Sequence, residues 1–81
     1  MDAKQRFLRH LGSQLFSART AAGLSQREVG EAAGIAGNTV ARIERGEQEP
    51  LAWALARICR AIGADPTAVL GVGAIGDPGA R

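Results

Sequence analysis

The sequence predicts an all-α fold of five helices in a single domain. Segments whose apolar residues recur at helical spacing are each closed by a glycine, the usual C-terminal cap of a helix. Signals for strands are weak, because there is no tyrosine and no stretch alternates with a period of two. The 81 residues contain no internal repeat, so we expect one domain over residues 1–71. The closing glycines are Gly23, Gly34, Gly46, Gly63 and Gly71.

The first helix is expected over residues 3–22. Asp2 and Gln5 can form a capping-box-like start, in which each side chain bonds the backbone N–H of the other residue. The apolar residues that follow share one face at helical spacing. They are Phe7, Leu8, Leu11, Leu15, Ala18 and Ala22.

The second helix is short and has the clearest start in the chain. Ser25 is a suitable N-cap, and Glu28 lies three residues further on, where it can complete a capping box. Leu24 can pack against Val29 across the cap as a hydrophobic staple. We expect this helix to end by Gly34.

Three further helices follow with short connections. The third is expected over residues 36–45. The fourth is expected to begin at Glu49–Pro50, with the proline in the first helical position, and to run to residue 62. The fifth is only a turn or two long and begins in the same way at Asp65–Pro66. Residues 72–81 form a glycine-rich tail that we expect to be flexible, unless its apolar residues dock on the domain or on a second copy.

The charge is unevenly distributed along the chain. The formal net charge is +2, but residues 1–27 carry five basic side chains against one acidic. Residues 28–49 carry two basic against five acidic side chains. Basic side chains at the front of the chain favour an acidic partner such as nucleic acid. Lys4, Arg6 and Arg9 contribute to this front and could reach a nucleic-acid backbone, although a solvated helix face is the favoured interpretation of them.

The composition argues against several function classes. His10 and the single cysteine, Cys59, have no companions at metal-ligand spacing and form no nucleophile pair, so we expect neither an enzyme nor a cofactor or metal site. Cys59 borders the apolar face of the fourth helix and is expected in the core. The N-terminus is polar and no stretch is apolar enough to span a bilayer, so we expect a cytoplasmic protein.

The second and third helices are joined by a tight turn, as in a helix-turn-helix. The stretch that contains them is LSQREVGEAAGIAGNTVARIERGEQEP, residues 24–50. It resembles the lambda-repressor/Cro-like (XRE-type) helix-turn-helix family, and the resemblance extends over about residues 11–71. The matching features are Leu24-Ser25-Gln26, a small Gly30, the turn at Gly34-Ile35, Thr39-Val40, Ile43-Glu44-Arg45-Gly46 and Pro50.

The resemblance implies a five-helix lambda-repressor-like domain that binds double-stranded operator DNA as a homodimer and regulates transcription, most often as a repressor. It places the third helix in the major groove, where each base pair shows a distinct donor and acceptor pattern. The implied base-reading positions are Gly37, Asn38, Thr39 and Arg42. The implied phosphate contacts are Ser25, Gln26, Arg27 and Arg45. A partly buried structural salt bridge is implied between Arg19 and Glu44.

The residues leave alternatives open for several of these roles. Asn38 could instead cap a helix that starts late, and Arg42 could touch phosphate only. Gly37 offers no side chain, so the first turn of the reading helix is bare and we expect modest direct readout, supplemented by dimer spacing and DNA shape. Trp53 points away from the inner face of the fourth helix, and Arg57 could stack on it. Trp53 is either a candidate surface for a partner or a single exposed aromatic packed on nearby parts of the chain.

Two other functions share the predicted fold. The first is the antitoxin of a toxin–antitoxin pair, which would hold its toxin through Trp53 and the tail. The second is a protein-binding helical module without DNA affinity. The bare first turn of the third helix and the acidic residues Glu47 and Glu49 after it favour this second alternative.

Overall fold

The computed structural model describes residues 1–71, and over these residues it is all-helical, as predicted. The predicted tail, residues 72–81, lies outside the described residues. The bounds of the helices are α1 Ala3–Ala22, α2 Gln26–Ala33, α3 Gly37–Glu44, α4 Ala52–Ile62 and α5 Pro66–Leu70. None of these helices is both long enough and apolar enough to cross a membrane.

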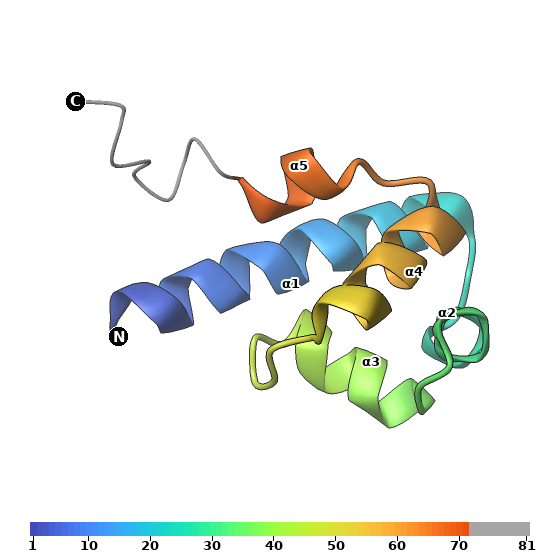
Figure 1. The fold of residues 1–81 in the computed structure, drawn as a ribbon, viewed down its shortest axis with the longest axis horizontal. Helices are drawn as coiled ribbons and strands as arrows, with labels where there is room; N and C mark the ends of the chain where they lie inside the picture. The colour runs from blue at the N-terminus through green and yellow to red at the C-terminus, as the bar shows by residue number, and fades with distance from the viewer. Residues whose placement is uncertain (72–81) are drawn as a thin grey trace.

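The long helix α1 is the support on which the other helices are arranged. It contacts α3, α4 and α5, whereas α2 packs against both α3 and α4. In Figure 1 its N-terminal half extends beyond the other helices, and α3 and α5 lie on opposite sides of it. The short helices α2 and α3 are therefore held together as a pair on one side of the molecule.

The predicted capping boxes form at the starts of α1 and α2. The Asp2 carboxylate accepts from the Gln5 N–H, and the Gln5 side chain accepts from the Asp2 N–H. At α2 the Ser25 hydroxyl accepts from the Glu28 N–H at 3.0 Å, and the Glu28 carboxylate accepts from the Ser25 N–H at 2.8 Å. These local bonds explain why both starts could be read from the sequence.

The predicted start of α4 at Glu49–Pro50 is wrong. The helix begins at Ala52 with Leu51 as its N-cap, so Pro50 precedes the cap instead of occupying the first turn. The Glu49 carboxylate is not used as a cap but lies 3.2 Å from the Lys4 ammonium of α1. Glu49 therefore contacts a distant part of the chain, and α4 is shorter than the sequence predicts.

The core lies where the inward faces of all five helices meet. Its most completely buried side chains include Leu11 and Leu15 of α1, Val40 and Ile43 of α3, and Ile58 of α4. Other members are Val29, Ala33, Cys59, Ile62 and Val69. Cys59 is 1% exposed, which confirms its predicted place in the core.

Two glycines allow helices to approach each other more closely than a side chain would permit. A Cβ atom on Gly12 would lie 2.4 Å from the Glu44 carbonyl oxygen, so α1 touches the end of α3 directly. A Cβ atom on Gly30 would lie 2.5 Å from the Ile35 carbonyl oxygen in the turn after α2. These two contacts set the position of α3 relative to α1 and α2.

Candidate nucleic-acid interface

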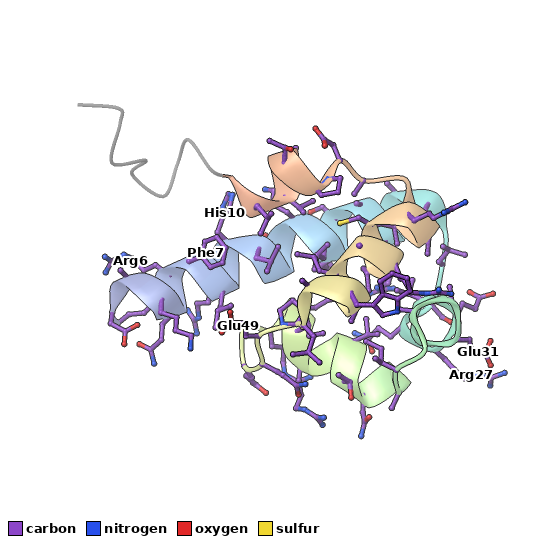
Figure 2. All side chains as sticks on the ribbon, in the orientation of Figure 1. Arg6, Phe7, His10, Arg27, Glu31 and Glu49 are labelled. Atoms are coloured by element: carbon purple, nitrogen blue, oxygen red, sulfur yellow. The ribbon has the colours of Figure 1, made fainter. Side chains whose placement is uncertain are left out.

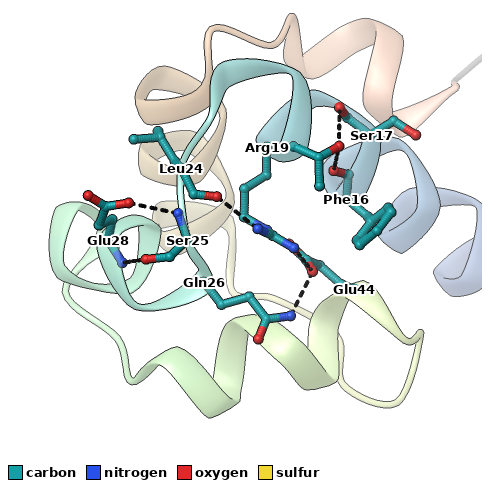
Figure 3. A network of polar contacts seen from close by, with 9 residues as sticks. Phe16, Ser17, Arg19, Leu24, Ser25, Gln26, Glu28 and Glu44 are labelled. Atoms are coloured by element: carbon teal, nitrogen blue, oxygen red, sulfur yellow. Dashed lines mark hydrogen bonds and ion pairs between the residues drawn. The ribbon is translucent and has the colours of Figure 1, made fainter.

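A polar network centred on Glu44 fixes α3 against α1 and α2. The Arg19 guanidinium donates to the Glu44 carboxylate through Nε at 2.6 Å and through Nη2 at 3.1 Å. Gln26, the first residue of α2, donates from Nε2 to the same carboxylate at 2.9 Å. Arg19 also donates from Nη1 to the Leu24 carbonyl oxygen at 2.8 Å (Figure 3). One buried carboxylate thus joins three segments of the chain.

The network is buried and fully partnered. The side chains of Arg19 and Glu44 are only 11% and 5% exposed. Within residues 1–71 no buried side-chain nitrogen or oxygen lacks a hydrogen-bond partner. The ion pair implied by the family resemblance is therefore present. The hydrogen bond from Gln26 of α2 is a second contact that holds Glu44 and thus α3 in place.

The start of α2 presents polar groups beside α3. Hydrogen bonds from Ser25, chiefly from its backbone N–H, hold the pKa of Glu28 below its usual value. Arg27 is largely exposed and lies 3.7 Å from Glu31, one turn further along the helix. Figure 2 shows this pair at the outer edge of the molecule. The first turn of α2 therefore keeps a cation at the surface and carries the partial positive charge of a helix N-terminus.

The outward face of α3 carries Asn38, Arg42 and Arg45. Because Val40 and Ile43 point into the core, residues 38, 42 and 45 fall on the opposite side of the helix. Asn38 and Arg45 are exposed, and Arg42 is partly buried. The alternative that Asn38 caps a late-starting helix is wrong, because α3 begins at Gly37 with Ala36 as its N-cap.

Gly37 lies on the side of α3 that faces α2. A Cβ atom at this position would lie 3.2 Å from the Cα of Arg27 and 3.4 Å from its backbone nitrogen. The missing side chain therefore allows close approach between the start of α3 and the start of α2. A longer residue here would press on Arg27 before it could extend outward.

Arg42 is held on both sides by neighbouring polar groups. Its Nε donates to the Gln48 side-chain oxygen at 2.9 Å, and its Nη2 donates to the Thr39 hydroxyl at 3.2 Å. Gln48 belongs to the loop after α3 and is not singled out by any sequence pattern. Its only signal in the sequence is its place two residues after Gly46, a glycine able to reverse the chain.

The acidic side chains of the loop after α3 are paired. Glu47 forms a two-point ion pair with Arg45, at 3.0 Å and 3.1 Å. This hydrogen-bonded pairing raises the pKa of Arg45 and lowers the pKa of Glu47. Glu49 pairs with Lys4 from the first turn of α1. The basic front of the chain therefore reaches this acidic loop and offsets part of its charge.

Comparison with known proteins places this arrangement in a family. The model of the helix-turn-helix domain family matches residues 10–70 of the chain. The chain belongs to this family. Its helix-turn-helix consists of α2 and α3 with the turn between them, and the resemblance predicted from the sequence is confirmed.

Two solved structures resemble the helix-turn-helix protein over most of its length. Both are crystal structures of the clp gene regulator ClgR from Corynebacterium glutamicum. One has a TM-score of 0.76 and 30% identity, and the match covers 91% of this chain and 81% of that chain. The other has a TM-score of 0.75 and 34% identity, covering 84% of this chain and 87% of that chain. No curated protein matches the sequence.

A second surface of the helix-turn-helix protein lies at the start of α4. Trp53 is 72% exposed and Leu51 is 80% exposed. The Arg57 guanidinium lies 5.6 Å from the centre of the Trp53 ring, as the spacing of the two residues predicts. Arg57 also donates from Nε and Nη2 to the Ala32 carbonyl oxygen at the end of α2, at 3.1 Å and 2.9 Å. One arginine thus joins this aromatic surface to the helix-turn-helix.

Proposed function

We propose that this protein is a DNA-binding transcriptional regulator that recognises a palindromic operator as a homodimer and acts as a repressor. The observation that carries the proposal is the outward face of α3, where Asn38 and Arg42 stand one turn apart on a braced helix. Asparagine can pair bidentately with adenine, and arginine with guanine, in the major groove. The helix-turn-helix family and the two gene-regulator structures support this reading. The role requires no catalytic residue and no cofactor.

Phosphate contacts would come from the start of α2 and the end of α3. Ser25 and Gln26 lie at a helix N-terminus, whose free N–H groups and dipole favour an anion. Arg27 lies beside the start of α3 and Arg45 caps its end, and both are exposed, so they add positive charge at the two ends of its outward face. Arg45 would have to give up a two-point ion pair with Glu47 to bind a phosphate, whereas Arg27 has only one longer contact with Glu31, so we assign Arg45 the smaller contribution.

Two copies would be needed for high specificity. Asn38, Thr39 and Arg42 can read only a few adjacent base pairs, and Gly37 reads none through a side chain. A two-fold dimer places two reading helices about 34 Å apart, one turn of DNA, and doubles the number of base contacts. DNA shape would supply part of the remaining discrimination. We propose that the protein acts in this form in the cytoplasm.

Binding to random duplex DNA at increasing salt tests the DNA-binding class. Release of counterions makes the affinity fall steeply with salt if several phosphates are contacted. We expect Arg27→Ala to reduce the steepness of the fall of log affinity with log salt concentration by about one, the effect of one lost phosphate contact. Arg60→Ala is the matched control, because it removes an equal charge from an exposed site on α4. Absence of binding at low salt and high protein concentration would overturn the proposal.

Selection of bound sequences from a random pool tests the base-reading roles. We expect Asn38→Ala and Arg42→Ala each to relax the preference at one position in each half-site. Each contact is expected to supply roughly fivefold or more of discrimination. If both variants select the same sequence as the wild type with the same stringency, these roles are wrong.

A second candidate function is protein binding through the start of α4. The exposed Trp53 and Leu51 favour it, because large apolar side chains at a surface are common anchors of interfaces. The partner would be a second copy of the chain, a toxin if the protein is an antitoxin, or another protein if it lacks DNA affinity. The tail that would assist it lies outside the described residues.

Sedimentation equilibrium tests whether this partner is a second copy of the chain. If Trp53 lies in the dimer interface, Trp53→Ala should weaken self-association, whereas Arg60→Ala should leave it unchanged. A dimer of unchanged strength would place Trp53 outside the dimer interface. A wild-type chain that stays monomeric at high concentration and on DNA would contradict the dimer itself.

A further inference from the structure

We infer that Gln48 is a positioning residue that fixes the Arg42 guanidinium for guanine recognition and thereby sets the specificity of the site. This inference rests on the proposed DNA-binding function and extends it to a residue outside the reading helix. It depends on three features: the turn that returns the loop to α3, the donor and acceptor pattern of the contact, and the edge of Arg42 that stays free.

The turn after α3 brings Gln48 back to Arg42. Gly46 has a φ of +76°, a left-handed conformation that reverses the chain. The Gly46 N–H donates to the Ile43 carbonyl oxygen at 3.0 Å, and the Glu47 N–H donates to the Arg42 carbonyl oxygen at 2.9 Å. Arg42 is therefore bonded at its main chain by Glu47 and at its side chain by Gln48, the next residue.

Only one donor and acceptor arrangement is possible between Arg42 and Gln48. An arginine side chain has only donors, so Gln48 must present its amide oxygen to Arg42 Nε. Thr39 accepts from Nη2 in the same way. Both partners are neutral, so they orient the guanidinium without cancelling its charge. In this respect the contact differs from the Arg45–Glu47 pair, in which a carboxylate opposes the positive charge.

The two contacts leave the end of the guanidinium available. Nη1 and one hydrogen of Nη2 have no part in them. We assign the Thr39 contact to the Nη2 hydrogen on the Nε side, because Gln48 is bonded there, and this leaves Nη1 and Nη2 as an edge with two parallel donors. Such an edge matches the O6 and N7 acceptors of guanine in the major groove. An arginine that is already oriented loses less side-chain freedom on binding, so more of its pairing energy serves discrimination. The assigned ligand of this edge is therefore a guanine base.

The test compares sequence selection by the wild type and four variants. Arg42→Ala first identifies the base position that depends on Arg42. At that position we expect Gln48→Ala to lower the preference for guanine about threefold to tenfold, part of the discrimination of one bidentate contact. Gln48→Glu keeps the acceptor, so the preference should remain while affinity for all sequences falls. Gln14→Ala, at an exposed glutamine of α1, is the matched control and should change neither.

A double variant and a measurement without DNA complete the design. Gln48→Ala combined with Arg42→Ala should behave like Arg42→Ala alone, because Gln48 acts through Arg42. In the free protein, the Arg42 Nε–H should exchange with water more slowly in the wild type than in Gln48→Ala, as measured by NMR.

The failure of this inference is distinguishable from the failure of the proposed function. A wild-type chain that selects no sequence would overturn both. If the preference for guanine at the Arg42 position is unchanged or stronger in Gln48→Ala, only the positioning role is overturned. A stronger preference would mean that Gln48 competes with guanine for the Arg42 guanidinium. Equal exchange of the Arg42 Nε–H in wild type and variant would overturn it as well.

Discussion

Arg19 of α1 and Glu44 of α3 form a two-point ion pair whose side chains are almost completely buried. The last residue of α3 is thereby tied to the helix that supports the domain. Gln26 bonds the same carboxylate from α2, so the pair also sets the angle within the helix-turn-helix.

Removing one partner of this pair should destabilise the fold more than replacing both. Glu44→Leu leaves a buried guanidinium without its counterion, and we expect a loss of about 3 kcal/mol in the free energy of unfolding. Arg19→Leu with Glu44→Leu removes both charges and should cost less than Glu44→Leu alone. Urea unfolding of the wild type, of Arg19→Leu and Glu44→Leu alone, and of the double variant measures the difference. A double variant whose loss equals the sum of the two single losses would show that the pair is not coupled.

Gly12→Ala should destabilise the domain although alanine is the better helix former. In an open helix the change gains about 1 kcal/mol. Here the new methyl group would meet the Ile43 and Glu44 carbonyl oxygens within 2.5 Å, so α1 must move away from α3. We expect a net loss of about 2 kcal/mol in thermal or urea unfolding. Ser13→Ala, at the exposed neighbouring position, should be neutral or stabilising; a stable Gly12→Ala chain would mean that α1 and α3 do not touch there.

The Cys59 thiol should be unreactive in the folded protein. It is 1% exposed, and burial raises its pKa, with a smaller effect from Asp65. We expect alkylation at mildly alkaline pH to proceed only as fast as the domain opens, and to become rapid in denaturant. Because the folded-state pKa is raised, stability should be full below the unfolded-state pKa and decline as the pH rises through the folded-state pKa. Reaction of the native thiol at the rate of a free cysteine would contradict its place in the core.

Stability at acidic pH should depend on the cap of α2. The pKa of Glu28 is lowered by its bonds with Ser25, so its contribution is present above the unfolded-state pKa and is lost as the pH falls through the folded-state pKa. Glu28→Gln can still accept the Ser25 N–H bond but does not titrate. The wild-type advantage over Glu28→Gln should therefore shrink between about pH 7 and about pH 3 in unfolding measurements. An advantage that is constant across this range would exclude the carboxylate as its source.

Capping and spacing made most of the helical framework readable from the sequence. The Asp2–Gln5 and Ser25–Glu28 capping boxes join residues three apart, so the interactions that stabilise each helix start involve only neighbouring positions in the sequence. The spacing of Val40 and Ile43 likewise determines which face of α3 is buried, and therefore that Asn38 and Arg42 face outward. The Arg19–Glu44 pair could be predicted only with the family resemblance, because its two residues lie on different helices.

What the sequence by itself determined is the local level: the five helices within residues 1–71, the helix-turn-helix, and the outward position of Asn38 and Arg42 on α3. The tertiary structure decided three further points: that Gly37 packs on Arg27, that Glu49 pairs with Lys4 instead of capping α4, and that Gln48 holds Arg42. Each of these depends on the path of the backbone between elements. Such contacts form between residues that packing brings together, so a periodic pattern in the sequence cannot predict them.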